Sequence, residues 1–557
     1  MKNNEKSKLT IPNLIKESVV KYAGKNSLVF AGEKNYSYRE LGVDIEKVAS
    51  LLSVLGVGKG DKVAVLSTNM PNWGVSFLAI SVLGAVAVPI LPDFHENEIK
   101  TIIEHSEAKI IFVSAGLYAN LSEESKKLVE HIILVDTFAI VPENVLVDEL
   151  FNIPVSLPEK SLANLWADVE EEDLASIIYT SGTTGNSKGV MLTHLNLAWT
   201  TQQCATLQVI KPEDRFLSVL PLSHTLENTV GFLLPLKYGA SVHYLRKPPV
   251  PSVLLPAFQV VKPTIMLSVP LIIEKVFRAK IYPEFQKSAV ISKLYSIAFF
   301  RKLLHKVAAK KLHKTFGGHL HFFGIGGAKL DPTVERFLME GGFPYAIGYG
   351  LTETSPLLAG AVGKNRKLGS TGIAMEGVQL RIANADPLTG EGEIQAKGLN
   401  VMRGYYKASE TTKEVFTEDG WFKTGDRGCF DKENKLYIKG RIKTMIVGAS
   451  GENIYPEEIE SVINKMRFVM ESLVIEKKGK LVAMIHLNME EIEQNFKLMK
   501  SEAQQFMHDK AEEILKEIHK KVNEEVNKFS RIQQVIWQPN PFEKTPTKKI
   551  KRFLYAK

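Results

Sequence analysis

Apolar residues recur along the first two hundred positions in two alternating patterns, one with helical spacing and one with the continuity of a buried strand. Helical spacing covers Tyr38–Leu55 and Trp73–Leu83, and Gly84 follows the second segment directly. Short apolar runs occupy Lys62–Leu66, Lys109–Val113, His131–Val135 and Ser176–Tyr179. Such runs predict strands buried on both faces. Because strands alternate with helices, the pattern predicts an α/β fold with a mostly parallel sheet.

The pattern changes after Lys443, where the chain becomes rich in lysine and glutamate. Two strands are expected at Val469–Glu476 and Lys480–Asn488, and a long charged helical region at Glu490–Asn527. A chain of 557 residues is too long for one core. We therefore expect a large domain of mixed, mostly parallel sheets at 1–440, a boundary at 441–444 and a small α+β domain at 445–557.

A basic stretch interrupts this order, since Gln286–Leu330 contains no Asp or Glu. Its cations between 293 and 314 are Lys293, Arg301, Lys302, Lys306, Lys310, Lys311 and Lys314. They alternate with Leu, Phe, Ile and Ala. This pattern predicts a basic amphipathic helix over 293–314 that is able to contact a membrane surface. An ordinary surface helix with solubilising lysines remains the alternative.

The segment Tyr179–Gly189, YTSGTTGNSKG, consists mostly of Gly, Ser and Thr and follows a predicted strand. Small residues let backbone N–H groups approach an anion, and Lys188 adds a positive charge, so a phosphate-binding loop is predicted. It is not a Walker A loop, because Gly189 rather than Ser or Thr follows Lys188. The same composition also suits a flexible linker, but apolar segments flank it on both sides.

Composition narrows the class of protein. The net charge of +8 suits anionic ligands but does not by itself indicate nucleic acid, which we do not expect as a partner. Cys204 and Cys429 are the only cysteines, a usage typical of a reducing compartment. The polar N-terminus shows no secretory signal, and no apolar run is long enough to span a bilayer. A cytoplasmic location is expected, with peripheral contact at the inner membrane face as a second possibility.

Four further motifs carry reactive groups. Tyr349–Thr354 (YGLTET) places an aromatic ring, hydroxyls and a carboxylate beside glycines, and Gly420–Asp426 (GWFKTGD) ends in an acid that can accept hydrogen bonds from sugar hydroxyls. Gly440–Lys443 (GRIK) follows, and Thr545–Arg552 (TPTKKIKR) is a cationic run near the end of the chain.

These motifs, together with YTSGTTGNSKG, resemble the acyl-adenylate-forming superfamily of acyl-CoA synthetases, peptide-synthetase adenylation domains and luciferases. The resemblance covers nearly the whole chain from Tyr36 onward. TPTKKIKR is most similar to the long-chain fatty acyl-CoA synthetases, as is a loop at Val447–Ile454 that is one residue longer than usual. Thr444 differs from the family pattern, in which an Asp is common at that position.

The resemblance implies a nucleotide site. It places Thr180, Ser181, Gly182, Thr183, Thr184, Gly185 and Lys188 around the β- and γ-phosphates of ATP. Glu353 would bind Mg²⁺ with help from Thr180, and Thr352 would contact the α-phosphate. Adenine would lie between Tyr349 and the backbone of 326–328. Asp426, supported by Arg441, would hold the ribose. The nucleotide-binding backbone positions are Gly326, Gly327, Ala328, Gly348 and Gly350.

The resemblance also implies two reaction steps. Lys549 would bridge the fatty carboxylate and the α-phosphate, and His224 would line their junction. The small domain would then rotate about Lys443 as a mobile lid. That rotation would present Gly448, Ser450, Gly451, Glu452 and Asn453 to the CoA tunnel. For single residues other interpretations stay open, since Tyr349 and His224 could be core residues and Asp426 a helix cap.

The function implied is an ATP-dependent long-chain fatty acid–CoA ligase. A carboxylate is a poor electrophile, and joining it to AMP with loss of pyrophosphate gives a mixed anhydride that the thiol of CoA can attack. Transfer of the same adenylate to an acyl-carrier protein is the first alternative. A non-catalytic acyl or nucleotide sensor is a distant one, because Lys188, Glu353, Asp426 and Lys549 are all present.

Overall fold

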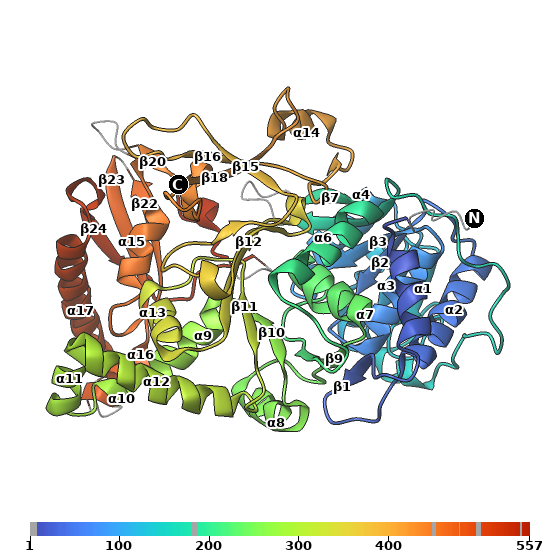
Figure 1. Ribbon diagram of the computed structural model, residues 1–557, viewed down its shortest axis with the longest axis horizontal. Coiled ribbons are helices and arrows are strands. Elements are labelled where there is room, and N and C mark those ends of the chain that lie inside the picture. The colour runs from blue at the N-terminus through green and yellow to red at the C-terminus, as the bar shows by residue number, and fades with distance from the viewer. Residues whose placement is uncertain are drawn as a thin grey trace.

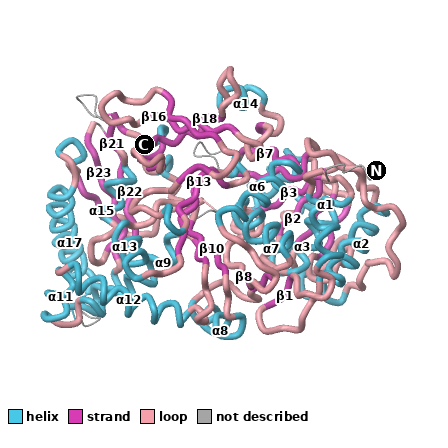
Figure 2. The backbone as a smooth tube through the Cα atoms, in the orientation of Figure 1, coloured by secondary structure: helices cyan, strands magenta, loops and turns pink. Residues whose placement is uncertain are grey.

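A computed structural model of the chain describes residues 8–180, 187–447, 453–477, 479–496, 503–545 and 549–556. Two large sheets lie next to each other in the larger body, and a smaller body formed by the C-terminal residues lies at one end (Figure 1). Helices cover the outer faces of these sheets, while strands from both large sheets run through the interior (Figure 2). This is the layered α/β arrangement that the sequence predicts.

The first large sheet has eight strands in the order β1-β9-β8-β10-β11-β12-β13-β14, and its pairs are parallel from β1 to β12. The last two pairs are antiparallel. The strands are β1 Leu28–Phe30, β8 Arg215–Leu217, β9 Ser241–Tyr244, β10 Ile265–Ser268, β11 Phe322–Ile325, β12 Tyr345–Gly350, β13 Leu357–Ala361 and β14 Ile373–Ala374.

The second large sheet has seven strands in the order β17-β7-β6-β3-β2-β4-β5. Its pairs are parallel from β6 to β5, and β7 and β17 extend it in antiparallel fashion. The strands are β2 Lys62–Leu66, β3 Val86–Ile90, β4 Ile110–Val113, β5 His131–Leu134, β6 Leu174–Thr180, β7 Lys188–Thr193 and β17 Gly404–Tyr405. The four strands predicted from apolar runs are β2, β4, β5 and β6, so these predictions are confirmed.

Helices of the larger body begin where the sequence supplies caps. At the start of α2, Ser37 Oγ accepts a hydrogen bond from the Glu40 backbone N–H, and the Glu40 carboxylate accepts one from the Ser37 N–H at 2.7 Å. The helices are α1 Ile11–Lys21, α2 Tyr38–Val54, α3 Pro71–Val82, α4 Glu96–Ser106, α5 Glu123–Lys126, α6 His194–Leu207, α7 Leu234–Tyr238, α8 Pro251–Val261, α9 Pro270–Val276, α10 Tyr282–Phe285, α11 Ala289–Ser296, α12 Ala298–Thr315, α13 Pro332–Gly341 and α14 Ser409–Val415. The helices predicted at 38–55 and 73–83 are confirmed as α2 and α3.

An antiparallel four-stranded sheet follows, in the order β15-β16-β18-β19, which the hydrophobic pattern had not indicated. It consists of β15 Gln379–Ala383, β16 Gly392–Lys397, β18 Phe422–Phe430 and β19 Leu436–Arg441. The register of its last pair sets Asp426 opposite Arg441. A hairpin of β20 Ile446–Val447 and β21 Asn453–Ile454 comes next.

The C-terminal body has its own three-stranded sheet and its own apolar core. Its elements are α15 Pro456–Ile463, β22 Val469–Lys477, β23 Lys480–Leu487, α16 Met489–Phe496, α17 Ala503–Glu525 and β24 Gln534–Trp537. The two strands and the helical region predicted here are confirmed. The separation into 1–440, a hinge at 441–444 and 445–557 stays a prediction, with which this separate core agrees.

The basic amphipathic helix expected over 293–314 is wrong as a single helix. The chain forms two helices, α11 and α12, because Ile297 between them adopts an extended conformation with φ −89° and ψ 120°. The backbone N–H of Ile297 bonds to Leu294, which closes α11. None of the described helices combines the length and apolar character needed to span a bilayer.

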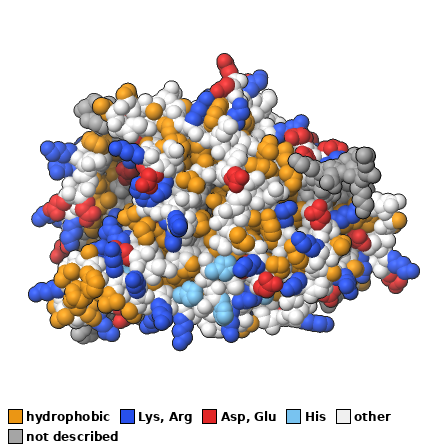
Figure 3. Space-filling view, viewed as in Figure 1, with side chains coloured by type: hydrophobic (Ala, Val, Ile, Leu, Met, Phe, Trp, Pro, Cys, Tyr) orange, Lys and Arg blue, Asp and Glu red, His pale blue; other side chains and the backbone are white. Residues whose placement is uncertain are grey.

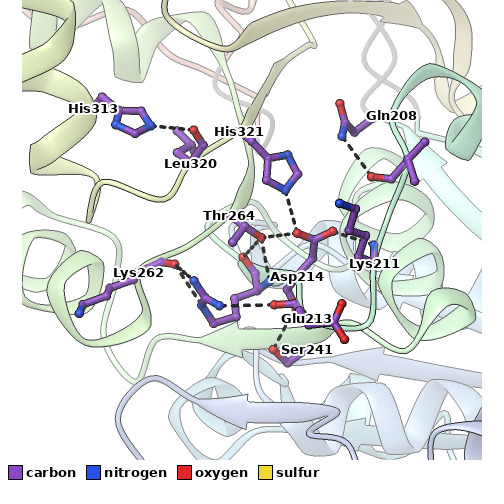
Figure 4. A network of polar contacts seen from close by, with 12 residues as sticks. Gln208, Lys211, Glu213, Asp214, Ser241, Lys262, Thr264, His313, Leu320 and His321 are labelled. Carbon is purple, nitrogen blue, oxygen red and sulfur yellow. Dashed lines mark hydrogen bonds and ion pairs between the residues drawn. The ribbon is translucent and has the colours of Figure 1, made fainter.

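A polar network fixes the amino-terminal edge of the eight-stranded sheet (Figure 4). Asp214, just before β8, accepts hydrogen bonds from Thr264 Oγ1 and from the backbone N–H of Lys211, at 2.8 and 2.7 Å. His321, just before β11, lies 2.8 Å from the same carboxylate. This network ties the starts of β8, β10 and β11 together and leaves their carboxyl ends at the opposite edge.

The two large sheets share one apolar core in which α3 is central. Trp73 stacks on Phe77, with ring centres 5.4 Å apart, and Phe232 meets both rings edge-on at 5.8 and 6.0 Å. Gly74 lies at this contact, and a Cβ there would lie 2.6 Å from a Leu28 methyl group and 2.8 Å from the Phe232 ring. The core therefore has no room for a side chain at this position.

We predict that Gly74→Ala lowers the melting temperature. Helix propensity favours alanine by about 1 kcal/mol, but overpacking a filled core costs about 1–3 kcal/mol. Gly116→Ala is the matched control, since nothing lies within 4 Å of a Cβ at that helical position. Differential scanning fluorimetry measures both. A melting temperature for Gly74→Ala equal to or above that of the unmodified chain would contradict this packing.

Candidate active site

The predicted site residues gather at the carboxyl ends of the parallel strands, where α/β folds bind ligands. Gly326, Gly327 and Ala328 follow β11, and Gly348, Tyr349 and Gly350 end β12. Gly327 has φ +86°, a left-handed conformation that favours glycine. At Gly350, a Cβ would lie 1.7 Å from the Pro356 carbonyl oxygen, so any side chain would displace the backbone. Glycine therefore allows the left-handed turn at Gly327 and the close backbone approach to Pro356 at Gly350.

Asp426 is the centre of a polar triad. Tyr349 donates its hydroxyl hydrogen to Asp426 Oδ2 at 2.7 Å, and Arg441 Nε lies 2.7 Å from Oδ1. Asp426 and Tyr349 are both buried. Burial raises the pKa of Asp426, whereas the charge of Arg441 and the Tyr349 hydrogen bond lower it. Each carboxylate oxygen keeps one lone pair free, so the triad can still accept two hydrogen bonds from a diol.

Glu353 lies on a short 3₁₀ turn after β12, and Tyr405 donates a hydrogen bond to its Oε1 at 2.9 Å. The same Tyr405 ring lies 5.0 Å from Lys188 Nζ, at the start of β7. Thr180, at the end of β6, pairs with Lys188 across the two strands. The predicted metal ligand Glu353 and the predicted phosphate-binding Lys188 therefore both contact the side chain of Tyr405.

Lys549 reaches this group from the C-terminal body. Desolvation and the charge of Arg441 lower its pKa, whereas the carboxylates of Asp426 and Glu353 raise it. The structure thus brings Lys549 together with Asp426, Glu353 and Arg441, although more than a hundred positions separate it from each of them.

His224 belongs to the same site. Burial, and after it the positive charge of Lys549, lowers the pKa of His224 to about 4, so the imidazole is neutral at pH 7. The backbone N–H of Leu226 donates to Nδ1 at 3.2 Å, which implies that the proton resides on Nε2. A neutral histidine with one free N–H can donate a hydrogen bond to an anionic oxygen.

The segment after His224 is more polar inside than the sequence suggests. Glu227 begins a π-helical segment, Glu227–Leu233, and burial raises its pKa to about 8. Ser218 Oγ donates to Glu227 Oε1 at 2.6 Å, while Glu227 Oε2 has no partner among the described residues. In the same segment, the buried side chains of Ser223, Thr225, Asn228 and Thr229 also have polar atoms without a partner among the described residues. The buried segment that follows His224 therefore contains polar as well as apolar side chains.

Several predicted residues lie outside the described part of the chain. These are Ser181, Gly182, Thr183, Thr184 and Gly185 of the glycine-rich loop, and Gly448, Ser450, Gly451 and Glu452 of the predicted CoA loop. Asn453 starts β21. Lys443 is exposed on a 3₁₀ turn at 442–444, directly after β19. Thr352 is half-buried beside Glu353. The roles of all these residues stay predictions.

The donor set suits a magnesium ion bound mainly by phosphates. No group of three or more His, Cys, Asp or Glu side chains is arranged to hold a metal in the described part of the chain. Glu353, with Thr180 at the adjoining strand end, supplies a carboxylate and a hydroxyl. Mg²⁺ commonly takes one or two protein carboxylates and completes its shell with water and substrate phosphates. The residues present therefore fit that ion.

Sequence reasoning missed Tyr405 and Glu457. Thr444 donates to Glu457 Oε1 at 2.7 Å, which links the predicted hinge to the start of α15. A glycine before two adjacent tyrosines, at Gly404–Tyr406, was the only local signal for Tyr405. For Glu457 there was none, because an acid in the first turn of a helix is ordinary.

Comparisons with known proteins agree with this arrangement. Residues 15–406 match the family described as AMP-binding enzyme. The chain is 30% identical over 562 residues to the long-chain-fatty-acid–CoA ligase FadD15 of Mycobacterium bovis, with 92% of this chain and 89% of that protein covered. It is 28% identical over 642 residues to the chloroplastic long-chain-fatty-acid–[acyl-carrier-protein] ligase AEE15 of Arabidopsis thaliana, with coverages of 97% and 84%.

Among solved structures, O-succinylbenzoate coenzyme A synthetase (MenE) of Bacillus subtilis in complex with ATP and magnesium matches with a TM-score of 0.73. The two chains are 22% identical, and the match covers 97% of this chain and 98% of that one. At this identity the likeness shows the fold, that of adenylate-forming enzymes. With the family match over residues 15–406 and the relative at 30% identity, the chain belongs to the AMP-binding enzyme family.

Proposed function

We propose that this protein activates a long-chain fatty acid with ATP to an acyl-adenylate, releasing pyrophosphate, and then transfers the acyl group to CoA. The observation that carries the proposal is that Lys549 lies near enough to Asp426, Glu353 and Arg441 for their charges to act on its pKa. The C-terminal body therefore contributes a lysine to the proposed nucleotide-binding site on the larger body. The relatives named as long-chain ligases support the substrate class.

The chemistry requires two anions to meet, since a carboxylate must attack the α-phosphorus of ATP. Lys549 would hold the fatty carboxylate against the α-phosphate, and Thr352 and neutral His224 would donate hydrogen bonds to their oxygens. Asp426 would accept the ribose hydroxyls, and Tyr349 would lie against adenine. Lys188 would contact the β- and γ-phosphates. Mg²⁺, held by Glu353 with Thr180, would neutralise charge on the phosphates when bound.

For the second step, we propose that the C-terminal body rotates about Lys443 so that the loop ending at Asn453 faces the pantetheine of CoA. Lys443 is exposed and directly follows the last strand of the four-stranded sheet. Thr444 bonds to Glu457 of α15, so the turn after Lys443 moves with the C-terminal body. A single residue can therefore absorb the change in backbone angles.

Pyrophosphate exchange into ATP, measured without CoA across fatty acids of increasing length, tests the first step. We expect exchange to be greatest with long acids, because the relatives named as ligases act on that class. Exchange confined to short or aromatic acids would overturn the long-chain assignment and keep the adenylation chemistry. No exchange with any carboxylate would favour a non-catalytic sensor instead.

Lys549→Ala is predicted to slow adenylation about a hundredfold, because one preorganised cation is removed from the reacting anions. Thioester formation from supplied acyl-adenylate and CoA should stay near the unmodified rate. Lys551→Ala is the matched control, because it removes a lysine two positions away that has no assigned role in the site. The two half-reactions are measured separately, by pyrophosphate exchange and by acyl-CoA formation. Equal loss of both in Lys549→Ala would contradict this division of labour.

The acceptor needs its own test, because one relative is named for an acyl-carrier protein rather than CoA. We propose CoA, since the relative with the higher identity is named as a CoA ligase. The net charge of +8 would also suit an acidic carrier protein. Supplying CoA and loaded carrier protein in separate assays of the same enzyme distinguishes the two.

We also propose that α11 and α12 contact an anionic lipid surface at the inner face of the membrane, with the protein otherwise cytoplasmic. Hydrophobic side chains gather over α11 at the lower left of the molecule (Figure 3). Phe299 is 73% exposed and Val307 66% exposed. Further exposed apolar side chains are Val290, Phe300 and Leu303 on these helices and Ile297 between them. Lysines surround them and no acid occurs from 286 to 330, whereas Arg301 is already paired with Glu340 of α13. The charge of the lysines complements anionic lipid.

Co-sedimentation with anionic vesicles tests this surface. We expect the unmodified protein to pellet at low salt, and a variant with Phe299→Ser and Val307→Ser to lose roughly tenfold or more in vesicle affinity. Leu388→Ser is the control, because Leu388 is 95% exposed on another part of the molecule. Light scattering on the protein alone tests whether this surface binds a second copy of the chain instead of lipid. No pelleting on anionic vesicles, or equal pelleting of all variants, would overturn the proposal.

A further inference from the structure

Tyr405 occupies a position in the site for which the proposed reaction has no stated role. It is buried, with 6% of its surface exposed, and it ends β17, a strand of only two residues. β17 pairs with β7, so that Tyr405 lies opposite Val190, two residues after Lys188. The backbone N–H of Tyr405 donates to Thr412 Oγ1 at 2.9 Å. Its neighbours Arg403 and Tyr406 donate their backbone N–H groups to carbonyls of β7, so the residue is held between β7 and Thr412.

The hydroxyl of Tyr405 holds one oxygen of Glu353. The distance from Tyr405 Oη to Glu353 Oε1 is 2.9 Å, and the backbone N–H of Met402 donates to the Glu353 carbonyl at 2.8 Å. Burial and the negative charge of Glu353 raise the pKa of Tyr405, so the hydroxyl keeps its proton and is the donor. With Oε1 engaged in this way, Oε2 is left for another ligand.

The ring of Tyr405 carries the second contact. Lys188 Nζ lies 5.0 Å from the ring centre, within the range of a cation–π interaction. The next residue, Tyr406, donates its backbone N–H to the Gly189 carbonyl at 2.8 Å. The strand that carries Lys188 and the turn that carries Glu353 are therefore both attached to residues 402–406.

We propose that Tyr405 is a positioning residue that couples the carboxylate of the metal ligand Glu353 to the phosphate-binding Lys188. This inference rests on the proposed function, because it takes Glu353 as the Mg²⁺ ligand and Lys188 as the phosphate contact. Hydrogen bonds that orient a ligating carboxylate affect metal affinity strongly. The hydroxyl of Tyr405 acts on the metal through Glu353, and its ring acts on the phosphates through Lys188.

Two substitutions separate these two effects. Tyr405→Phe removes the hydrogen bond to Glu353 and keeps the ring under Lys188. We expect it to weaken Mg²⁺ binding to the enzyme–ATP complex about tenfold, with the affinity for metal-free ATP unchanged. Tyr405→Leu removes both contacts and should in addition weaken metal-free ATP binding a few-fold. Isothermal titration calorimetry of ATP, with and without Mg²⁺, measures both affinities without relying on turnover.

Tyr406→Phe is the matched control, since the Tyr406 hydroxyl contacts Glu107 at 3.3 Å on an exposed part of the surface. A Mg²⁺ affinity for Tyr405→Phe equal to that of the unmodified chain would overturn the inference, as would the same loss in Tyr406→Phe. Melting temperatures of the variants show whether a loss comes from unfolding instead. If the unmodified chain binds no Mg²⁺ATP, the proposed function fails first, which is a distinguishable outcome.

Discussion

The buried carboxylate of Asp426 is the constraint on which the site depends. A buried charge is costly unless it is paired and hydrogen-bonded, and here each oxygen has its own partner, Tyr349 on one side and Arg441 on the other. Tyr349 comes from the eight-stranded sheet, whereas Asp426 and Arg441 come from the four-stranded sheet. The triad therefore joins two sheets at the carboxyl end of β12. Arg441 also lies just before the turn that leads to the C-terminal body. Its ion pair with Asp426 therefore holds the chain in place at the start of that body.

The sequence predicted those elements whose hydrophobic pattern is continuous. The apolar run at Lys62–Leu66 coincides with β2, because that strand is almost entirely buried. The helical spacing from Tyr38 agrees with α2 within one residue, because that helix buries one face. The four-stranded sheet was not predicted, since strands such as β15 are only half-buried and their pattern is weak. The break at Ile297 was also missed, because a β-branched residue in an apolar helix carries no local signal of an extended backbone.

The site residues that lie in motifs of glycines and charged residues could be predicted from the sequence. Residues whose position depends on pairing between distant strands could not. Glu353, Asp426 and Lys549 lie in recognisable motifs, and the structure brings them together. Tyr405 lies in the site because β17 pairs with β7, more than two hundred positions earlier in the chain. No local pattern in the sequence reveals this pairing. Likewise, no local pattern indicates that polar side chains from Ser223 to Thr229 are buried without partners among the described residues. Burial of Glu227 becomes apparent only when the segment is packed against Ser218.

The charges at the site also indicate what would survive a rotation of the C-terminal body. Asp426 would lose the influence of Lys549 but would keep Arg441 and Tyr349, both of which precede the proposed hinge at Lys443. His224 would remain neutral, because burial outweighs the charge of Lys549 as the cause of its lowered pKa. The ribose and adenine contacts would thus stay assembled while the cation between carboxylate and α-phosphate departs. An adenylate could in this way remain bound while the group that assisted its formation is withdrawn, which is what a second reaction at the same carbonyl carbon requires.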